Sequence, residues 1–457
     1  MGSNGVEGEA LSNPSEASAS LSTWKAEKPT ARARLKSAAN WIAEHELWWL
    51  AVPVTLMLFF GRVPIRVISA SLWLIPIPWV CRRVAKGYLT VHTPMDLPIV
   101  ILLGMALVGL YPSVDPSMSM PVLYKMIVEF ALFYGLVNSF HSESRIRATV
   151  AVLLLAGTGA SLLGLLGTGG MSPDFLALLG SRRDFVLQLV RRLNEAGFNG
   201  NIVGGTLAMI FPLYLLLFLF DSKGPSAGSG RSLWKLFLGL SLPLVGGTLL
   251  LTQSRGAIVG VVLALLAVGV WRSRWVLASL PVLVAGILWT VGHFGTQQVA
   301  EFLLVTNTTV TAAGRSELWQ RAIYMMQDFP YTGIGLGTFS KVAPVLYPFF
   351  LIGPDTKVPH VHNLVLQAGV DLGVPGLVAM IGLLTVFFII ALQTVRLARN
   401  TSLKPLSVGL LCGFIVYLIH GLVDHVTFST KPGIVIWAIM GLIVAIYRRH
   451  RERDLAR

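Results

Sequence analysis

Long apolar runs separated by short polar stretches make up most of this chain of 457 residues. A run of roughly 20 apolar residues can cross the hydrocarbon core of a bilayer as a helix. The pattern therefore predicts an all-α integral membrane protein, a polytopic bundle of about twelve transmembrane helices. The predicted spans are 47–61, 66–81, 96–111, 121–140, 147–168, 199–220, 233–252, 256–271, 275–293, 364–395, 405–422 and 432–447.

The tenth run is long, and it contains the sequence Gly373-Val374-Pro375-Gly376. Proline removes a helical hydrogen bond and glycine permits irregular backbone, so this run is expected to begin as a re-entrant or broken piece. The first two runs each have a short apolar core, because Arg62, Pro64 and Arg66 lie at their junction.

One long polar interruption, residues 294–363, separates the ninth run from the tenth. We expect it to contain amphipathic helices, one of which is capped by Ser316 and ends before Pro330. The glycine-rich run 333–337 resembles part of a dinucleotide fingerprint, but no strand precedes it, and a flexible turn is favoured. The apolar face of the expected helix, predicted to pack against the membrane domain, consists of Leu318, Trp319, Ala322, Met325, Met326 and Phe329.

The composition agrees with a membrane protein. Charged residues make up 13% of the chain, against roughly 25% in soluble domains. The net charge is +14, but no basic face interleaved with aromatic residues lies outside the predicted spans, which argues against nucleic-acid binding. Cys81 and Cys412 have no spacing that indicates a metal site or a disulfide framework.

The distribution of cations predicts the orientation. Most of the 36 Lys and Arg residues fall on one side when the links are assigned alternately to the two faces of the membrane. Because cations are retained on the cytoplasmic side, both termini are predicted to be cytoplasmic. The expected organisation is a disordered cytoplasmic tail (1–40), nine transmembrane helices (41–293), an extracytoplasmic loop (294–363), three further transmembrane helices (364–447) and a basic cytoplasmic tail (448–457).

The stretch from Arg32 to Trp49 mixes cations with tryptophans. This combination is typical of a helix that lies in the membrane interface. We therefore predict an interfacial helix that leads into the first span.

Several arginines resist the bias toward the cytoplasmic side. Arg255 lies in the short link between two spans, where a cation is costly and usually has a partner. Its small neighbours Ser254 and Gly256 could let a phosphate approach the guanidinium fork, although an arginine extended toward water at a helix start is the alternative. Arg315 adds a cation to a helix start already suited to anions. The remaining outward arginines, for which loop solubility or headgroup anchoring competes with a functional role, are Arg182, Arg183, Arg191 and Arg192.

Two imidazoles, His360 and His362, lie where the chain re-enters the bilayer. They could bind a metal with ligands from His420, Asp424 and His425. They could also be structural, hydrogen-bonded at the bilayer edge. The third interpretation, which we favour, is general-base or substrate-positioning work, because histidine titrates near neutral pH and can accept a hydroxyl proton.

Taken in order, the motifs from about residue 190 onward resemble those of the O-antigen ligase and polymerase superfamily of bacterial cell membranes. The first half of the chain matches only as hydrophobic spans. The bulky Val361 departs from the family pattern, which has small residues beside the His-Asn pair. The matching pieces are Gly197-Phe198-Asn199-Gly200-Asn201, Phe211-Pro212-Leu213, Ser254-Arg255-Gly256, Gly314-Arg315, Trp319, Pro330, the glycine-rich run 333–337 with Thr338-Phe339, His360-Val361-His362-Asn363, Gly373, Gly376, His420-Gly421-Leu422-Val423-Asp424 and Trp437.

The resemblance implies a GT-C-like membrane glycosyltransferase in the bacterial inner membrane. The donor would be a glycan on undecaprenyl pyrophosphate, the acceptor lipid A-core or another lipid-linked glycan, and neither cofactor nor metal would be required. His362, helped by His360, would orient or deprotonate the acceptor hydroxyl. The residues that would bind the donor pyrophosphate are Arg255, Arg315, Arg192 and Arg191, and those that would support the site are Asn363, Asn201, Asp424 and His420.

Three alternatives to a ligase follow. A polymerase would use the same donor chemistry with a second lipid-linked repeat unit as acceptor, and a protein O-glycosyltransferase would use a Ser or Thr. A lipid-carrier transporter would show paired halves with broken helices near mid-membrane. We find no repeat between the halves, and the charged candidates cluster at one face, which disfavours transport.

Overall fold

In the computed structural model all regular elements of the described residues are helices, and no β-strand occurs among them. The described residues are 30–58, 63–140, 142–167, 199–221, 223–224, 230–273, 279–296, 312–353, 356, 358–424 and 431–455. The helices are α1 (Ala31–Glu44), α2 (Glu46–Leu58), α3 (Ile65–Ser71), η1 (Leu72–Leu74), α4 (Pro76–Lys86), α5 (Asp96–Val108), α6 (Pro116–Ser139), α7 (Glu143–Gly167), α10 (Gly200–Phe220), α11 (Gly230–Leu251), α12 (Arg255–Arg272), α13 (Ser279–Phe294), α15 (Ala312–Asp328), α16 (Phe339–Leu346), α17 (Leu364–Leu397), α18 (Lys404–Gly421) and α19 (Lys431–Leu455).

Each predicted span overlaps one described helix, or in the case of 66–81 the consecutive helices α3, η1 and α4, which confirms an all-α polytopic membrane protein. Nine described helical segments are long and apolar enough to cross a membrane. They comprise the α3–α4 segment, α6, α7, α10, α11, α12, α17, α18 and α19. Helices α2 and α5 are apolar but shorter. The count of twelve spans therefore remains a prediction.

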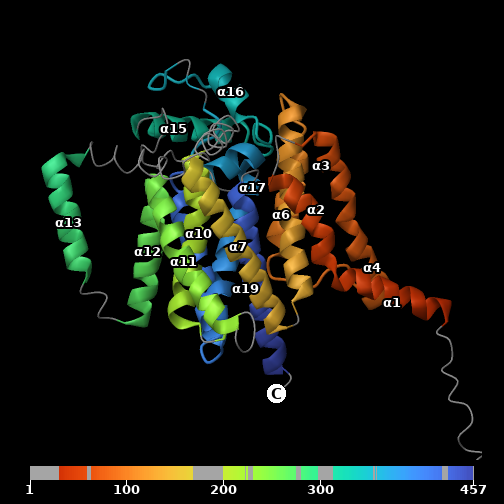
Figure 1. Ribbon diagram of the computed structural model, residues 1–457. Coiled ribbons are helices and arrows are strands. Elements are labelled where there is room, and N and C mark those ends of the chain that lie inside the picture. Colours follow the sequence, from red (N-terminus) through yellow and green to blue (C-terminus); the bar gives the residue numbers. More distant parts are fainter. Residues whose placement is uncertain are drawn as a thin grey trace, which may run out of the picture.

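Helix α10 packs against α18, α11, α12 and α7, and the bundle builds around it (Figure 1). Close contact with α18 depends on two glycines four residues apart, Gly409 and Gly413, which share one face of that helix. A Cβ at position 413 would lie 2.3 Å from the carbonyl oxygen of Met209. Small residues therefore let two buried helices approach without a hydrophobic driving force between them.

Helix α17 is broken at Gly373, as the sequence predicts. This residue has φ 68° and ψ −176°, a conformation essentially restricted to glycine. The break leaves backbone groups of α17 without partners in their own helix. Segment 330–337 supplies those partners, because Ile334 N donates to Val370 O at 2.9 Å and Val374 N donates to Pro330 O at 2.7 Å. The predicted turn is therefore confirmed, but these hydrogen bonds fix it against the break, so it is not flexible.

Helices α15 and α16 form an outer layer across one end of the bundle (Figure 1). Helix α15 begins at Ala312, so the predicted start at Ser316 is wrong. The hydroxyl of Ser316 instead donates to the carbonyl of Ala313 inside the first turn. The predicted apolar face is confirmed, since Leu318, Ala322 and Met325 are buried and Trp319, Met326 and Phe329 pack against the same cluster.

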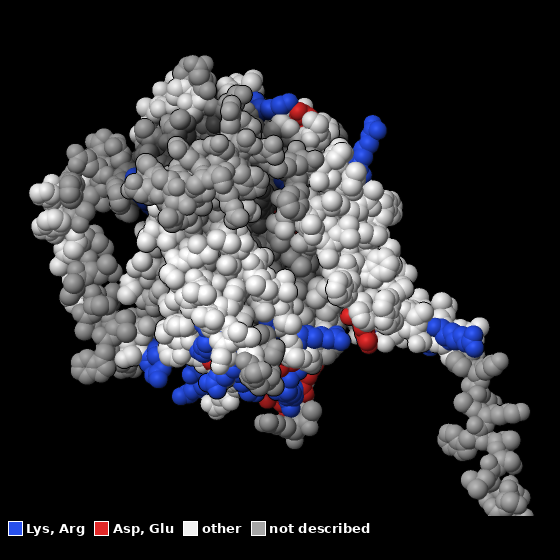
Figure 2. All heavy atoms as spheres, in the orientation of Figure 1, with Lys and Arg blue, Asp and Glu red and all other residues white. Residues whose placement is uncertain are grey.

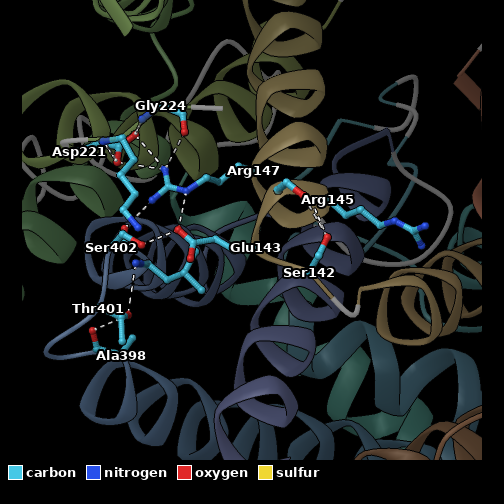
Figure 3. Close-up of polar contacts among 12 residues, drawn as sticks. Ser142, Glu143, Arg145, Arg147, Asp221, Gly224, Ala398, Thr401 and Ser402 are labelled. Carbon is cyan, nitrogen blue, oxygen red and sulfur yellow. Dashed lines mark hydrogen bonds and ion pairs between the residues drawn. The ribbon is translucent and has the colours of Figure 1, made fainter. Parts of the chain in front are cut away.

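Buried Arg147 joins three segments at the opposite end of the bundle from α15 (Figure 3). Its Nε donates to Glu143 at 3.0 Å, and its Nη1 donates to the two carboxylate oxygens of Asp221 at 3.0 and 3.1 Å. Further bonds reach the carbonyls of Gly224 at 3.3 Å and Ser402 at 2.8 Å. One guanidinium thus ties α7 to the segment after α10 and to the link between α17 and α18.

Lys and Arg side chains gather at the end of the molecule where the C-terminus lies (Figure 2). Helix α1 runs away from the bundle near that end (Figure 1). It begins at Ala31, after Thr30 caps it, and so it occupies part of the range 1–40 that was assigned to a disordered tail. Residues 1–29 lie outside the described part of the chain.

Candidate functional site

Four chain segments that are distant in sequence meet beside the outer layer. They are the start of α17, the end of α18, the start of α12 and the first turn of α15. The contacts that join them run through the end of α18 and the residues after it, namely His420, Val423 and Asp424. The candidate site thus forms where spans end, rather than inside one helix.

His362 and Asp424 form a buried pair. Nδ1 of His362 lies 3.1 Å from Oδ1 of Asp424, and the two residues are 5% and 7% exposed. Because an ionised carboxylate only accepts hydrogen bonds, Nδ1 carries the proton and Nε2 of a neutral imidazole keeps its lone pair. The pair therefore has the orientation that a general base needs.

The electrostatics keep Asp424 ionised. Burial by itself raises the pKa of this carboxyl, but the hydrogen bond from His362 and the charges of His420 and His360 bring it well below its usual value. Nε2 of His420 lies 3.8 Å from the second carboxylate oxygen. The ring of His360 lies edge-on to His362, with centroids 4.2 Å apart. Asp424 thus connects all three imidazoles.

Asn363 positions the histidine next to it. Its Oδ1 accepts from the backbone N–H groups of Val365 and Leu366 at 3.0 Å, which caps α17, while its Nδ2 donates to the carbonyl of Leu422 at 3.0 Å. One amide therefore begins α17 and fastens it to the end of α18. Val361 is fully buried in the outer-layer cluster and takes no part in the site.

The start of α12 lies against the end of α18. A Cβ on Gly256 would lie 2.6 Å from Cγ2 of Val423 and 3.1 Å from Cδ2 of His420. Ser254 is fully buried and lies against α10. The small neighbours of Arg255 therefore serve helix packing, and the approach of a phosphate to Arg255 stays a prediction. Arg255 itself is half-buried beside this contact.

Arg315 lies in the first turn of α15 and is only 1% exposed. Its Nη1 donates to the carbonyl of Val423 at 2.5 Å. Burial lowers the pKa of this guanidinium and the charge of Asp424 opposes that change. In this conformation Arg315 fastens the outer layer to the Asp424 segment.

Two residues with strained backbone conformations also lie at or next to the candidate site. Among the described residues, only Gln253 and His362 combine a side chain with a positive φ, 54° in each case. Such conformations cost about 1–3 kcal/mol and concentrate at functional sites. Gln253 precedes Arg255 by two residues, and sequence patterns give no signal for it. The carbonyl of Val423 is a second contact that no sequence signal could reveal, since any residue type carries one.

The remaining predicted residues fall into two groups. Asn201 is buried in the first turn of α10, and its neighbour Gly200 lies against the carbonyl of Thr252, close to the turn that precedes Arg255. The others lie outside the described residues, namely Arg182, Arg183, Arg191, Arg192 and His425.

A metal could also use part of this set. One donor atom from each of His360, His362 and Asp424 lies within 4.8 Å of the other two. Two imidazoles and one carboxylate are suitable ligands for zinc. The three residues could therefore bind a metal. Nδ1 of His362 and the carboxylate of Asp424 are, however, already joined by a hydrogen bond.

The family model described as O-antigen ligase matches residues 239–381. This match supports membership of the chain in the O-antigen ligase and polymerase superfamily. The match includes Arg255, Arg315 and His362, and it ends after the break in α17. Asp424 lies beyond it, so the His362–Asp424 pair is a finding of the structure. No curated protein matches the chain. Membership in this superfamily indicates an integral membrane protein with glycosyltransferase-like activity on lipid-linked glycans.

Proposed function

We propose that this protein is an O-antigen ligase. It transfers a glycan from undecaprenyl pyrophosphate to a sugar hydroxyl of lipid A-core at the outer face of the bacterial inner membrane. The observation that carries the proposal is the buried His362–Asp424 pair, held at the meeting point of α12, α15, α17 and α18.

In the proposed reaction the acceptor hydroxyl attacks the anomeric carbon of the donor sugar. The bond from that carbon to the phosphate oxygen breaks, and undecaprenyl pyrophosphate leaves with the electron pair. Nε2 of His362 takes the hydroxyl proton, while Asp424 stabilises the imidazolium that forms. Attack opposite the leaving group inverts the anomeric centre.

The leaving pyrophosphate needs positive charge, which Arg255 is placed to supply. Arg255 is half-buried at the start of α12, where the amides of the first helical turn also favour an anion. Arg315 is almost fully buried behind Asp424, so direct contact with the donor would require it to leave the Val423 carbonyl. Cations that stabilise the charge in the transition state can replace a metal.

Purified protein in lipid nanodiscs provides the test. The protein receives a glycan on undecaprenyl pyrophosphate, with either lipid A-core or a second lipid-linked glycan as acceptor. A single capped lipid A-core is the expected product. A ladder of longer lipid-linked glycans would identify a polymerase instead, and no transfer to either acceptor would contradict both.

The catalytic assignment has its own test. His362→Ala should abolish transfer and regain part of it when imidazole is added, because the missing group is a base. His92→Ala is the matched control, since His92 is fully exposed and, among the described residues, pairs with Asp96 at the start of α5 rather than with any residue of the site. Near-normal turnover of His362→Ala would refute the assignment.

A further inference from the structure

An apolar cavity lies at the corner between α1 and α2, and none of the elements that hold His362 contributes to it. Its volume is about 420 Å³, within the range of small-molecule sites in proteins, roughly 300–1,000 Å³. Aromatic rings dominate its walls. The lining residues are Trp41, His45, Trp48, Trp49, Val52 and Leu74.

The corner is held rigidly by a buried ion pair. Arg82 of α4 donates to the carbonyl of Ala43, in the last turn of α1, at 2.9 Å and to the Glu46 carboxylate, in the first turn of α2, at 2.5 Å. The second oxygen of Glu46 accepts from Nε1 of Trp79 at 2.6 Å and from Nδ2 of Asn138 at 3.5 Å. Because Arg82 and Glu46 are buried, the angle between α1 and α2 is fixed. The cavity is therefore preformed, which lowers the cost of binding.

The walls of the cavity open to the surroundings of the protein. Trp48 is 76% exposed and Trp41 is 60% exposed, although both are large aromatic residues. Tryptophan concentrates at the level of lipid headgroups, where its ring lies between apolar and wet surroundings. Their position at the junction of a peripheral helix with apolar α2 fits that level (Figure 1).

Cations line the helix that leads to the cavity. Arg32, Arg34 and Lys36 are all exposed on α1. Arg34 precedes Trp41 by seven residues, so both occupy the same face about 10 Å apart along the helix. The acidic residue of α1, Glu44, is already paired with Lys86 at 3.6 Å. Arg34 therefore places a positive charge beside the cavity, whereas helical spacing puts Arg32 and Lys36 on other faces of α1.

We propose that this corner binds one anionic phospholipid, with an acyl chain in the tryptophan-lined cavity and the phosphate against Arg34, which shares the face of Trp41. The cavity suits a hydrocarbon chain, and the charge selects an anionic headgroup, at roughly five-fold in binding for each cation near the surface. The site anchors α1 in the membrane interface. It does not depend on glycan transfer.

Photocrosslinking in nanodiscs tests the proposal. The probes are phosphatidylglycerol and phosphatidylcholine that carry a diazirine on one acyl chain, and mass spectrometry locates the adducts. Adducts should fall between residues 41 and 52, with phosphatidylglycerol labelling at least five-fold more than phosphatidylcholine. The triple variant Arg32→Gln, Arg34→Gln, Lys36→Gln should remove this preference and keep the labelling by phosphatidylcholine.

Two tryptophan variants complete the test. Trp48→Ala should reduce the adducts several-fold, whereas Trp73→Ala should leave them unchanged, because Trp73 is 78% exposed on η1 but does not line the cavity. Equal labelling by both probes would overturn the proposal. So would an absence of adducts at this corner, as expected if part of the chain itself fills the cavity, or an equal effect of the two tryptophan variants.

Discussion

Replacing Arg147 by methionine should destabilise the bundle strongly, even though Arg147 lies at the opposite end from the candidate site. The change keeps a long apolar side chain and removes every hydrogen bond that the guanidinium donates. Asp221, whose side chain is 1% exposed, would lose its cation and keep only the backbone N–H groups of Lys223 and Gly224 as donors. Removing one member of a buried ion pair costs about 3–5 kcal/mol.

Arg145 supplies the matched control on the same helix, since Arg145→Met makes the same chemical change two residues away. Arg145 is exposed, makes a long hydrogen bond to the carbonyl of Ser139 at 3.3 Å, and points away from the Arg147 cluster (Figure 3). Exposed substitutions of this kind stay within about 0.5 kcal/mol. The contrast between the two variants therefore isolates burial and pairing from the loss of one positive charge.

Thermal unfolding in nanodiscs, followed by intrinsic fluorescence, measures the difference. With roughly 1 °C per kcal/mol for a chain of this size, Arg147→Met should unfold about 3–5 °C below the unmodified protein and Arg145→Met within about 0.5 °C. Adding Asp221→Asn to Arg147→Met should recover part of the loss, because the uncompensated charge is then absent. Equal midpoints for the two methionine variants would refute the reasoning.

Three further predictions concern the site. Asp424→Asn should lower kcat about 10- to 100-fold with little change in protein yield, since a hydrogen bond to a charged group contributes about 1.5–3 kcal/mol; unchanged kcat in the transfer assay would contradict the His362–Asp424 assignment. Gly373→Ala should destabilise the protein by at least about 1–3 kcal/mol in the same unfolding measurement, because its φ is positive and a Cβ would lie 2.8 Å from the carbonyl of Pro330. Gly382→Ala, on the same helix with open space around it, is its control. Chelators should leave transfer intact, and a loss that zinc restores would favour the metal interpretation.

The sequence predicts the helices of this protein well, and the reason is physical. A bilayer span requires an apolar run of defined length, so composition and length suffice to locate α6, α10 or α18. The break in α17 was equally accessible, because Gly373 and Pro375 are themselves the cause of the irregular backbone. The start of α15 was misplaced at Ser316, since a capping residue is a local preference that packing of the preceding turn overrides.

Less of the candidate site than of the helices could be predicted from the sequence. The order of the motifs along the chain identified His362, Arg255 and Arg315 as candidates, because the chemistry of histidine and arginine can be recognised from residue type alone. Asp424 was predicted as a supporting residue, but its hydrogen bond to His362 was not accessible, since 62 residues separate them and nothing local encodes their 3.1 Å contact. The structure alone likewise shows why position 256 is a glycine, since a side chain there would meet the end of α18.

By itself, the sequence therefore determined that the chain is an all-helical membrane protein, where its spans lie and which residues could do chemistry. Each of these follows from residue type and spacing along one helix. The tertiary structure decided that Asp424 holds His362, that Arg315 is buried behind this pair, and that Trp41 and Trp48 frame a cavity at a fixed corner. Those arrangements depend on contacts between helices that are far apart in the chain, and their geometry exists only when the helices pack.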